Sequence, residues 1–346
     1  MCDEGARNDL NDLGTRRGYQ LGGPYDLRRR GRAASIPAMT ATWTDRALGS
    51  VLGLALGDAL GAPFEFTRSE EIPDPLPAFE RPWLGLPPGT PTDDTAMARS
   101  LMRSLAERGG FDAGDLLERH VGWLASEPPD VGALTRRVLS MVAPGRPPDE
   151  AARLVWEQRG PEVSAGNGSV MYCAPLGVAY AHRPEQLHEL APAFSAITHW
   201  DERCRTAVTA VTLAVAAFVR GDTRIEAVQG ALVAVEDREG AEELEYLVEA
   251  AGTQRRIDGP DQGFCLFTAG IALQAALRED ENAERTLRRV VGFGGDTDTN
   301  AAVAGALVGA RDGLGGLPEP WLERLIDRDA IRAEAEALLP LAKRGR

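Results

Sequence analysis

The chain has 346 residues, of which 43% are hydrophobic and 26% are charged, enough for one large folded domain or two small ones. A formal net charge of −14 argues against a nucleic-acid backbone or an anionic membrane surface as the main partner. Lys343 is the single lysine, which excludes a Walker phosphate loop, a Schiff-base enzyme and a protein kinase, because each needs a lysine inside a structured motif.

Residues 1–38 mix arginine, aspartate, glycine and asparagine without periodicity, so we expect a disordered extension there, with a basic targeting arm as the alternative. No run in the chain approaches the roughly 18 uninterrupted apolar residues of a membrane span. The four cysteines show no CxxC spacing and predict a reducing cytoplasm rather than a disulfide framework. The four histidines lack the HExxH spacing of a zinc site.

The first helical segment runs from Thr44 to Leu60 and is followed by Pro63 and Glu65. Its glycines recur at every fourth position: Gly49, Gly53, Gly57 and Gly61. This stripe lets another helix approach closely, which predicts a buried central helix. From these residues alone we interpret Glu65 as a loop charge. The alternative is a carboxylate in partly apolar surroundings with a raised pKa.

The proline-rich residues 67–91 have no helical period and predict a long surface loop, which is a candidate lid. At its end, the run Gly89–Thr95 places Asp93 and Asp94 directly before a helical pattern. Each carboxylate at a helix start gains about 0.3–1 kcal/mol from the helix dipole, so both fit simple helix-start acids. The alternative is a pair of metal ligands.

The turn Gly166-Asn167-Gly168-Ser169 is predicted to open another helix. Backbone N–H groups at a helix start, together with side-chain donors from Ser164, Asn167 and Ser169, make a candidate anion site. An ordinary Asn-Gly turn is the alternative. Further along, His199 also has two interpretations: it is either a core or capping histidine or part of a ligand pocket.

The run Gly294–Asn300 (GGDTDTN) combines two glycines, which allow positive φ, with two carboxylates and neighbouring hydroxyls. Capping of the following helix explains one of Asp296 and Asp298, but not both. Oxygen donors at this density suit a hard cation. Because the acidic turn at Asp93 and Asp94 has the same character, we predict that the two turns form a joint metal site.

Helical patterns fill most of the chain beyond the first segment, at 96–107, 112–126, 130–142, 149–159, 184–196, 207–219, 222–236, 241–252, 261–279, 283–293, 300–311, 319–327 and 329–342. No alternating run of β-branched residues is longer than four or five, so folds built on parallel sheets lose their main support. We predict a single all-α domain over residues 39–343 with about twelve helices.

These motifs, in this order, resemble the ADP-ribosylglycohydrolase family over nearly all of residues 44–312. The resemblance is carried by Gly53–Gly61 (GLALGDALG), Glu65, Thr92–Thr95, Gly166–Ser169, Thr198–His199 and Gly294–Asn300. It implies an orthogonal multi-helix domain whose central cleft holds two Mg²⁺ ions, with Mn²⁺ as the alternative. The implied metal ligands are Thr92, Asp93, Asp94, Asp296, Asp298 and Thr299. The residues implied to face ADP-ribose are Ser164, Asn167, Gly168 and His199, with Ser169 as a further donor.

The resemblance also implies a Mg²⁺-dependent hydrolase that cleaves the glycosidic bond between ADP-ribose and a protein side chain or small acceptor. Its partner would be an ADP-ribosylated protein or a small ADP-ribose conjugate. Glu65, then the mobile acid of the cleft, joins Asp94 and Asp296 as the candidates for proton transfer. Tyr172 stands where many relatives have arginine, so the substrate stays open. The alternatives are a non-catalytic ADP-ribose-binding or structural paralogue and a divalent-metal phosphohydrolase.

Overall fold

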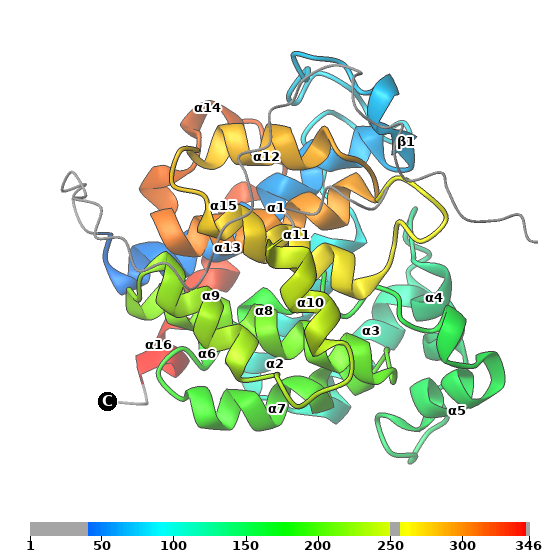
Figure 1. The fold of residues 1–346 in the computed structure, drawn as a ribbon. Coiled ribbons are helices and arrows are strands. Elements are labelled where there is room, and N and C mark those ends of the chain that lie inside the picture. The colour runs from blue at the N-terminus through cyan, green and yellow to red at the C-terminus, as the bar shows by residue number, and fades with distance from the viewer. Residues whose placement is uncertain (1–40, 250–256, 344–346) are drawn as a thin grey trace, which may run out of the picture.

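Two helices from opposite ends of the chain, α1 (Trp43–Gly61) and α13 (Thr297–Asp312), lie side by side at the centre of the protein (Figure 1). The computed structural model describes residues 41–249 and 257–343. Most residues of both helices are buried. Their backbones nearly touch, because a Cβ added at Gly53 or Gly57 would overlap a carbonyl oxygen of α13. The glycine stripe of the sequence is therefore the contact surface of the central helix pair.

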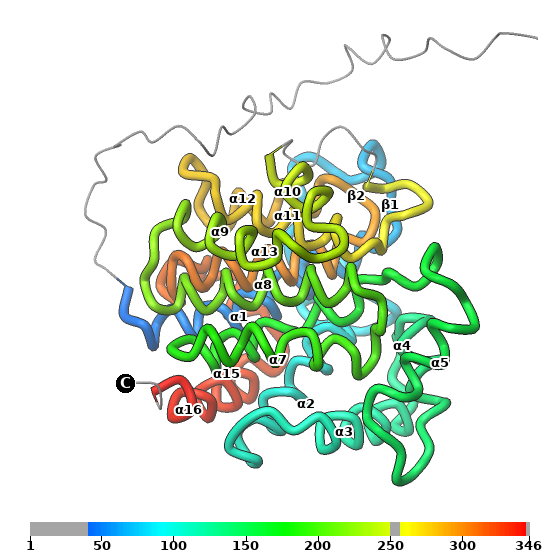
Figure 2. Tube along the Cα trace, turned by 60° about the horizontal axis from the view of Figure 1, so that its bottom comes forward, coloured from blue at the N-terminus to red at the C-terminus, as the bar shows by residue number. Residues whose placement is uncertain are grey.

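The other helices surround this pair, and α3, α4 and α5 form one edge of the molecule (Figure 2). The helices around the pair are α2 (Asp93–Arg108), α3 (Ala113–Ala125), α4 (Ala133–Ser140), α5 (Glu150–Arg159), α6 (Ala174–Ala179), α7 (Pro184–Ala196), α8 (Glu202–Arg220), α9 (Arg224–Val233), α10 (Ala241–Glu249), α11 (Cys265–Leu277), α12 (Ala283–Val291), α14 (Glu319–Leu322), α15 (Arg328–Glu336) and α16 (Leu339–Lys343). Two short strands, β1 (Thr67–Arg68) and β2 (Gly294–Gly295), pair antiparallel. The predicted all-α fold is confirmed.

The predicted number of about twelve helices is wrong, since the described residues contain sixteen α-helices. One reason is that the pattern at 329–342 is two helices: α15 ends at Glu336, and Pro340 lies in the first turn of α16, where a proline is tolerated. The prediction that Gly166–Ser169 opens a helix is also wrong. Asn167 N–H bonds to Gly263 O across the chain, and the next helix, α6, begins only at Ala174.

The residues that follow α1 are held against the protein at several points. Phe66 N–H donates to Gly295 O at 2.7 Å, and β1 continues this pairing with β2. Within the predicted surface loop at 67–91, the side chains of Leu76, Phe79 and Trp83 are buried. The loop is thus anchored to the core at these side chains, and its use as a lid stays a prediction. The extension predicted at 1–38 lies outside the described residues.

One stretch of the described chain, Trp43–Phe64, is long and apolar enough to cross a membrane by length and composition alone. Within this stretch, 94% of the apolar window is buried inside the protein. That burial is what a central core helix requires, and it agrees with the packing of α1 against α13.

Candidate metal centre

The first acidic turn forms the N-terminus of α2. Thr92 is the N-cap residue, and its hydroxyl oxygen accepts from the backbone N–H of Asp94 at 3.4 Å. Asp93 and Asp94 occupy the first helical turn and are both buried. A second carboxylate also reaches this turn, because Asp58 of α1 accepts hydrogen bonds from the backbone N–H groups of Thr92 and Thr95. The turn is therefore held both by its own threonine and by the central helix.

The second acidic turn forms the N-terminus of α13. Gly294 and Gly295 have φ values of 74° and 73°, and a side chain on either would meet backbone atoms of a neighbouring segment. These two glycines place Asp296 at the N-cap position and Asp298 in the first turn, where its Oδ1 accepts from Thr299 N–H at 2.9 Å. The glycines thus allow β2 to lead directly into a buried acidic helix start.

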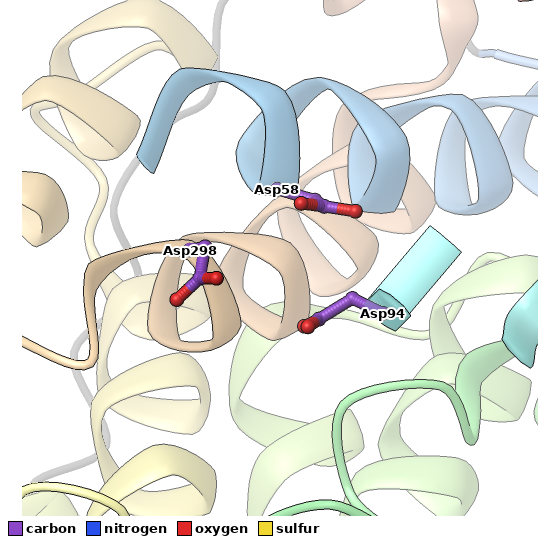
Figure 3. A group of neighbouring side chains, drawn as sticks. All are labelled: Asp58, Asp94 and Asp298. Carbon is purple, nitrogen blue, oxygen red and sulfur yellow. The ribbon is translucent and has the colours of Figure 1, made fainter. Parts of the chain in front are cut away.

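The two turns meet in space. Thr299 Oγ1 donates to Asp94 Oδ2 at 3.4 Å, across 205 positions of sequence. One carboxylate oxygen from each of Asp58, Asp94 and Asp298 lies within 4.8 Å of the others, and Figure 3 shows these side chains arriving from three different helices. The structure thus brings together Thr92, Asp94, Asp298 and Thr299, which the sequence placed in two distant turns.

The residues of this cluster fit a divalent cation. Asp58, Asp94 and Asp298 are almost fully buried, and Asp94 Oδ1 has no hydrogen-bond donor among the described residues. Burial, followed by the charge of Asp58, raises the pKa of Asp94 well above its usual range, and burial with the charge of Asp296 does the same for Asp298. Buried carboxylates that destabilise one another form a favourable site for a hard cation with oxygen ligands.

A second acidic group lies beside the first and is more open to solvent. Glu65, Asp130 and Asp298 each place one carboxylate oxygen within 4.8 Å of the others, and Glu65 and Asp130 are only partly buried. Burial, followed by the charge of Asp130, raises the pKa of Glu65 to about 8 and that of Asp93 to about 7. The interpretation of Glu65 as a simple loop charge is therefore wrong, because its carboxyl group belongs to this cluster.

The turn at Gly166–Ser169 borders the same region. Asn167 Nδ2 donates to Asp296 Oδ2 at 2.8 Å and to Thr268 Oγ1 at 3.0 Å, so this amide fixes the orientation of one acidic side chain. His199 packs against the turn, since a Cβ on Gly168 would lie 2.8 Å from His199 Cε1. Its Nδ1 hydrogen-bonds to Thr198 Oγ1 at 2.9 Å, and burial lowers the pKa of the imidazole to about 4. The histidine is therefore neutral at physiological pH.

Two of the residues predicted to contact ADP-ribose form hydrogen bonds within the protein instead. Ser164 Oγ donates to Gly160 O at 2.6 Å, and Ser169 Oγ hydrogen-bonds to Ser195 Oγ at 2.9 Å. The Tyr172 ring is fully buried and packs edge-on against His120 and Phe194. The tyrosine that the resemblance marks as a departure is thus a core residue, and its effect on the substrate stays a prediction.

Asp58 and Asp130 have no role predicted from the sequence. The signal for Asp58 was available, because an acidic residue inside an apolar, glycine-rich helix needs a partner or a ligand. Asp130 follows two prolines in a loop and carried no local pattern that distinguishes it from a surface acid. Its relevance arises from tertiary packing, which brings it to Glu65 and Asp298.

The all-α scaffold thus gathers buried carboxylates and threonine hydroxyls from several helices into a site that could hold a metal ion. A model of the ADP-ribosylglycohydrolase family matches residues 39–346, and the chain belongs to this family. It is accordingly a hydrolase of ADP-ribosyl glycosidic bonds.

Relatives support the same assignment along most of the chain. The protein is similar to ADP-ribosyl-[dinitrogen reductase] glycohydrolase of Rhodospirillum rubrum, with 33% identity over 309 residues, 86% of this chain and 97% of that protein. ADP-ribosylarginine hydrolase Tri1 of Serratia proteamaculans (strain 568) is 25% identical over 308 residues, which cover 86% of this chain and 80% of that protein. Among solved structures, an ADP-ribosylglycohydrolase-related protein complex matches with a TM-score of 0.70 and 33% identity, covering 87% of this chain and 99% of that one.

Proposed function

We propose that the protein is a Mg²⁺-dependent hydrolase that cleaves the N-glycosidic bond between ADP-ribose and the guanidinium group of an arginine side chain. The observation that carries the proposal is the partly exposed acidic pair Glu65 and Asp130 beside the buried carboxylate cluster. The Asp130 carboxylate of this pair attracts a cationic leaving group, whereas the neutral oxygen of a seryl linkage is not attracted in this way. The name of one relative, ADP-ribosylarginine hydrolase Tri1, agrees with this acceptor.

The proposed ligands of two Mg²⁺ ions, or of Mn²⁺ in their place, are Thr92, Asp93, Asp94, Asp296, Asp298 and Thr299. Bound divalent cations would supply Lewis-acid chemistry, by which ribose hydroxyls are held and polarised. Asn167 would keep Asp296 in its orientation through the 2.8 Å hydrogen bond between them. His199 and Gly168 would border the ADP-ribose, where the neutral imidazole packs against the backbone of the turn.

The proposed reaction adds the hydroxide of water to the anomeric carbon, breaks the carbon–nitrogen bond and returns the proton of that water to the leaving nitrogen. Glu65 is the group for this proton transfer, because its raised pKa lies close to neutral pH and it stands next to the cluster. Asp130 would hold the guanidinium in line with the bond that breaks. Asp94 and Asp296 are assigned to cation binding rather than to the proton.

Mass spectrometry of reaction products tests the proposal. The protein is incubated with ADP-ribosyl-arginine, ADP-ribosyl-serine and O-acetyl-ADP-ribose, each with Mg²⁺ and with a chelator. We expect free ADP-ribose and arginine from the first substrate, and only with Mg²⁺. Faster cleavage of the seryl conjugate would overturn the arginine assignment. Release of phosphate would identify a phosphohydrolase, and no product from any substrate would identify a non-catalytic paralogue.

A further inference from the structure

Both oxygens of the Asp58 carboxylate accept hydrogen bonds from the N-terminus of a helix other than its own. Its Oδ1 accepts from Thr92 N–H at 2.9 Å, and its Oδ2 accepts from Thr92 N–H at 3.0 Å, from Thr95 N–H at 3.0 Å and from the Thr95 hydroxyl at 2.6 Å. The side chain is fully buried. Backbone N–H groups in the first turn of a helix have no partner within that helix, so Asp58 completes α2 from outside.

The same residue is fixed rigidly to the other half of the metal centre. Gly57 and Gly61 flank Asp58 on α1, and a Cβ on either would overlap a carbonyl oxygen of α13. Thr297 Oγ1 also donates to Gly61 O at 2.9 Å. Since the next residue after Thr297 is Asp298, the backbone that carries Asp58 is held directly against the second acidic turn.

We propose that Asp58 is a positioning residue that sets the separation of the two acidic turns, holding Thr92 and Asp94 at a fixed distance from Asp298 rather than binding a cation itself. This inference rests on the proposed metal centre. It follows from the use of both carboxylate oxygens by α2, which leaves Asp94 Oδ1, and not Asp58, as the oxygen without a donor among the described residues. An anion at this place also interacts favourably with the positive end of the α2 dipole.

Asparagine at this position would replace one acceptor oxygen with an N–H₂ group that faces backbone N–H donors. The α2 start would then shift, and Asp94 would move with it relative to Asp298. Residues that orient metal ligands without touching the metal affect cation affinity by about 10- to 100-fold when they are changed. We expect a loss of Mn²⁺ affinity in this range for Asp58→Asn. Thr95→Val, which removes a single hydrogen bond to Asp58, should lower affinity in the same direction by up to about tenfold.

The experiment measures Mn²⁺ binding by calorimetry and the electron paramagnetic resonance spectrum of the Mn²⁺-loaded protein. It compares the wild type with Asp58→Asn, Thr95→Val and the double variant. Ser50→Ala is the control, because Ser50 is also buried on α1 and its hydroxyl has no hydrogen-bond partner among the described residues. Circular dichroism establishes that each variant is folded before its affinity is compared.

We expect both single variants to bind Mn²⁺ more weakly and to show altered spectra, and the double variant to resemble Asp58→Asn, since the two changes break one shared interaction. Ser50→Ala should match the wild type in both measurements. Weaker binding by Asp58→Asn with wild-type binding by Thr95→Val would overturn the inference and make Asp58 a direct ligand. Wild-type binding by both variants would also overturn it. Failure of the wild-type protein to bind Mn²⁺ would instead refute the proposed metal centre.

Discussion

Replacing Gly57 by alanine tests the close contact on which both the fold and the metal centre depend. A Cβ at this position would overlap Ala301 O and would lie 2.9 Å from Ala302 N. Both atoms belong to the α13 backbone, so no side-chain rotation can relieve the overlap. The two central helices would have to separate instead.

The size of the effect follows from this geometry. Ordinary van der Waals contacts of a Cβ begin at 3.4 Å, so α1 and α13 must move apart by something on the order of 1 Å. Overpacking of a core typically costs about 1–3 kcal/mol, and contact between two backbones places this variant at the upper end. Alanine returns up to about 1 kcal/mol through its higher helix propensity. We therefore expect a net loss of about 2 kcal/mol in the free energy of unfolding.

Urea unfolding in the presence of a chelator measures this loss, and a Mg²⁺ titration of the folded variant measures its effect on the site. Affinity should fall, because separation of the helices moves Asp58 and the α2 start away from Asp298. Gly230→Ala in α9 is the matched control, since a Cβ there meets nothing within 4 Å and should stabilise the protein by up to about 1 kcal/mol. If Gly57→Ala were as stable as Gly230→Ala, the account of the central helix pair would be refuted.

Four further changes test individual groups. Glu65→Gln should lower kcat at least about 100-fold with little change in Mg²⁺ affinity, because it removes the proton carrier and keeps the shape; equal losses in both would contradict this role. Asp130→Asn should raise KM about tenfold for ADP-ribosyl-arginine and not for ADP-ribosyl-serine in steady-state assays. Asp298→Asn should raise the Tm measured in chelator, since it removes one of the mutually repelling carboxylates, and should abolish the Tm increase on adding Mg²⁺. His120→Leu should remove an acid-sensitive part of the stability, because burial lowers the pKa of His120 to about 3 in the folded protein. As the pH falls below the unfolded pKa near 6.5, the wild type should lose about 1.4 kcal/mol of stability per pH unit, or about 2 kcal/mol by pH 5, and the variant should not. Urea unfolding of both proteins from pH 7.5 to 5 measures this difference.

The sequence was sufficient for the fold class because the helical signal is local. Apolar residues at helical spacing and the glycine stripe of α1 are properties of neighbouring positions, and they predicted both the all-α fold and a central, closely packed helix. The sequence predicted the positions at which helices begin and end less well. The turn at Gly166–Ser169 looks like a helix start in isolation, but its backbone bonds to Gly263, about one hundred positions away, and no local pattern encodes that partner.

The candidate site shows the same division between local and tertiary information. The two acidic turns at Asp93 and Asp298 are visible in the sequence because glycine, proline and oxygen-rich side chains gather there. Asp130 could not be recognised from the sequence, because its importance depends on which loops fold over the cluster. Asp58 lies between these cases: its charge within an apolar helix is anomalous, yet only the structure reveals that the α2 N-terminus is its partner.

A buried group of like charges has a consequence for the stability of the protein without its cation. The carboxylates of Asp94 and Asp298 are desolvated and lie close to one another, so their ionisation at neutral pH lowers the stability of the folded protein. A bound divalent cation reverses the sign of that interaction. The glycine contacts of α1 and the hydrogen bonds of Asp58 have the same effect: they hold the two acidic turns together against the repulsion between their carboxylates. Stability of the scaffold and affinity for the cation are therefore properties of the same contacts, and a change that relaxes the helix pair should weaken both.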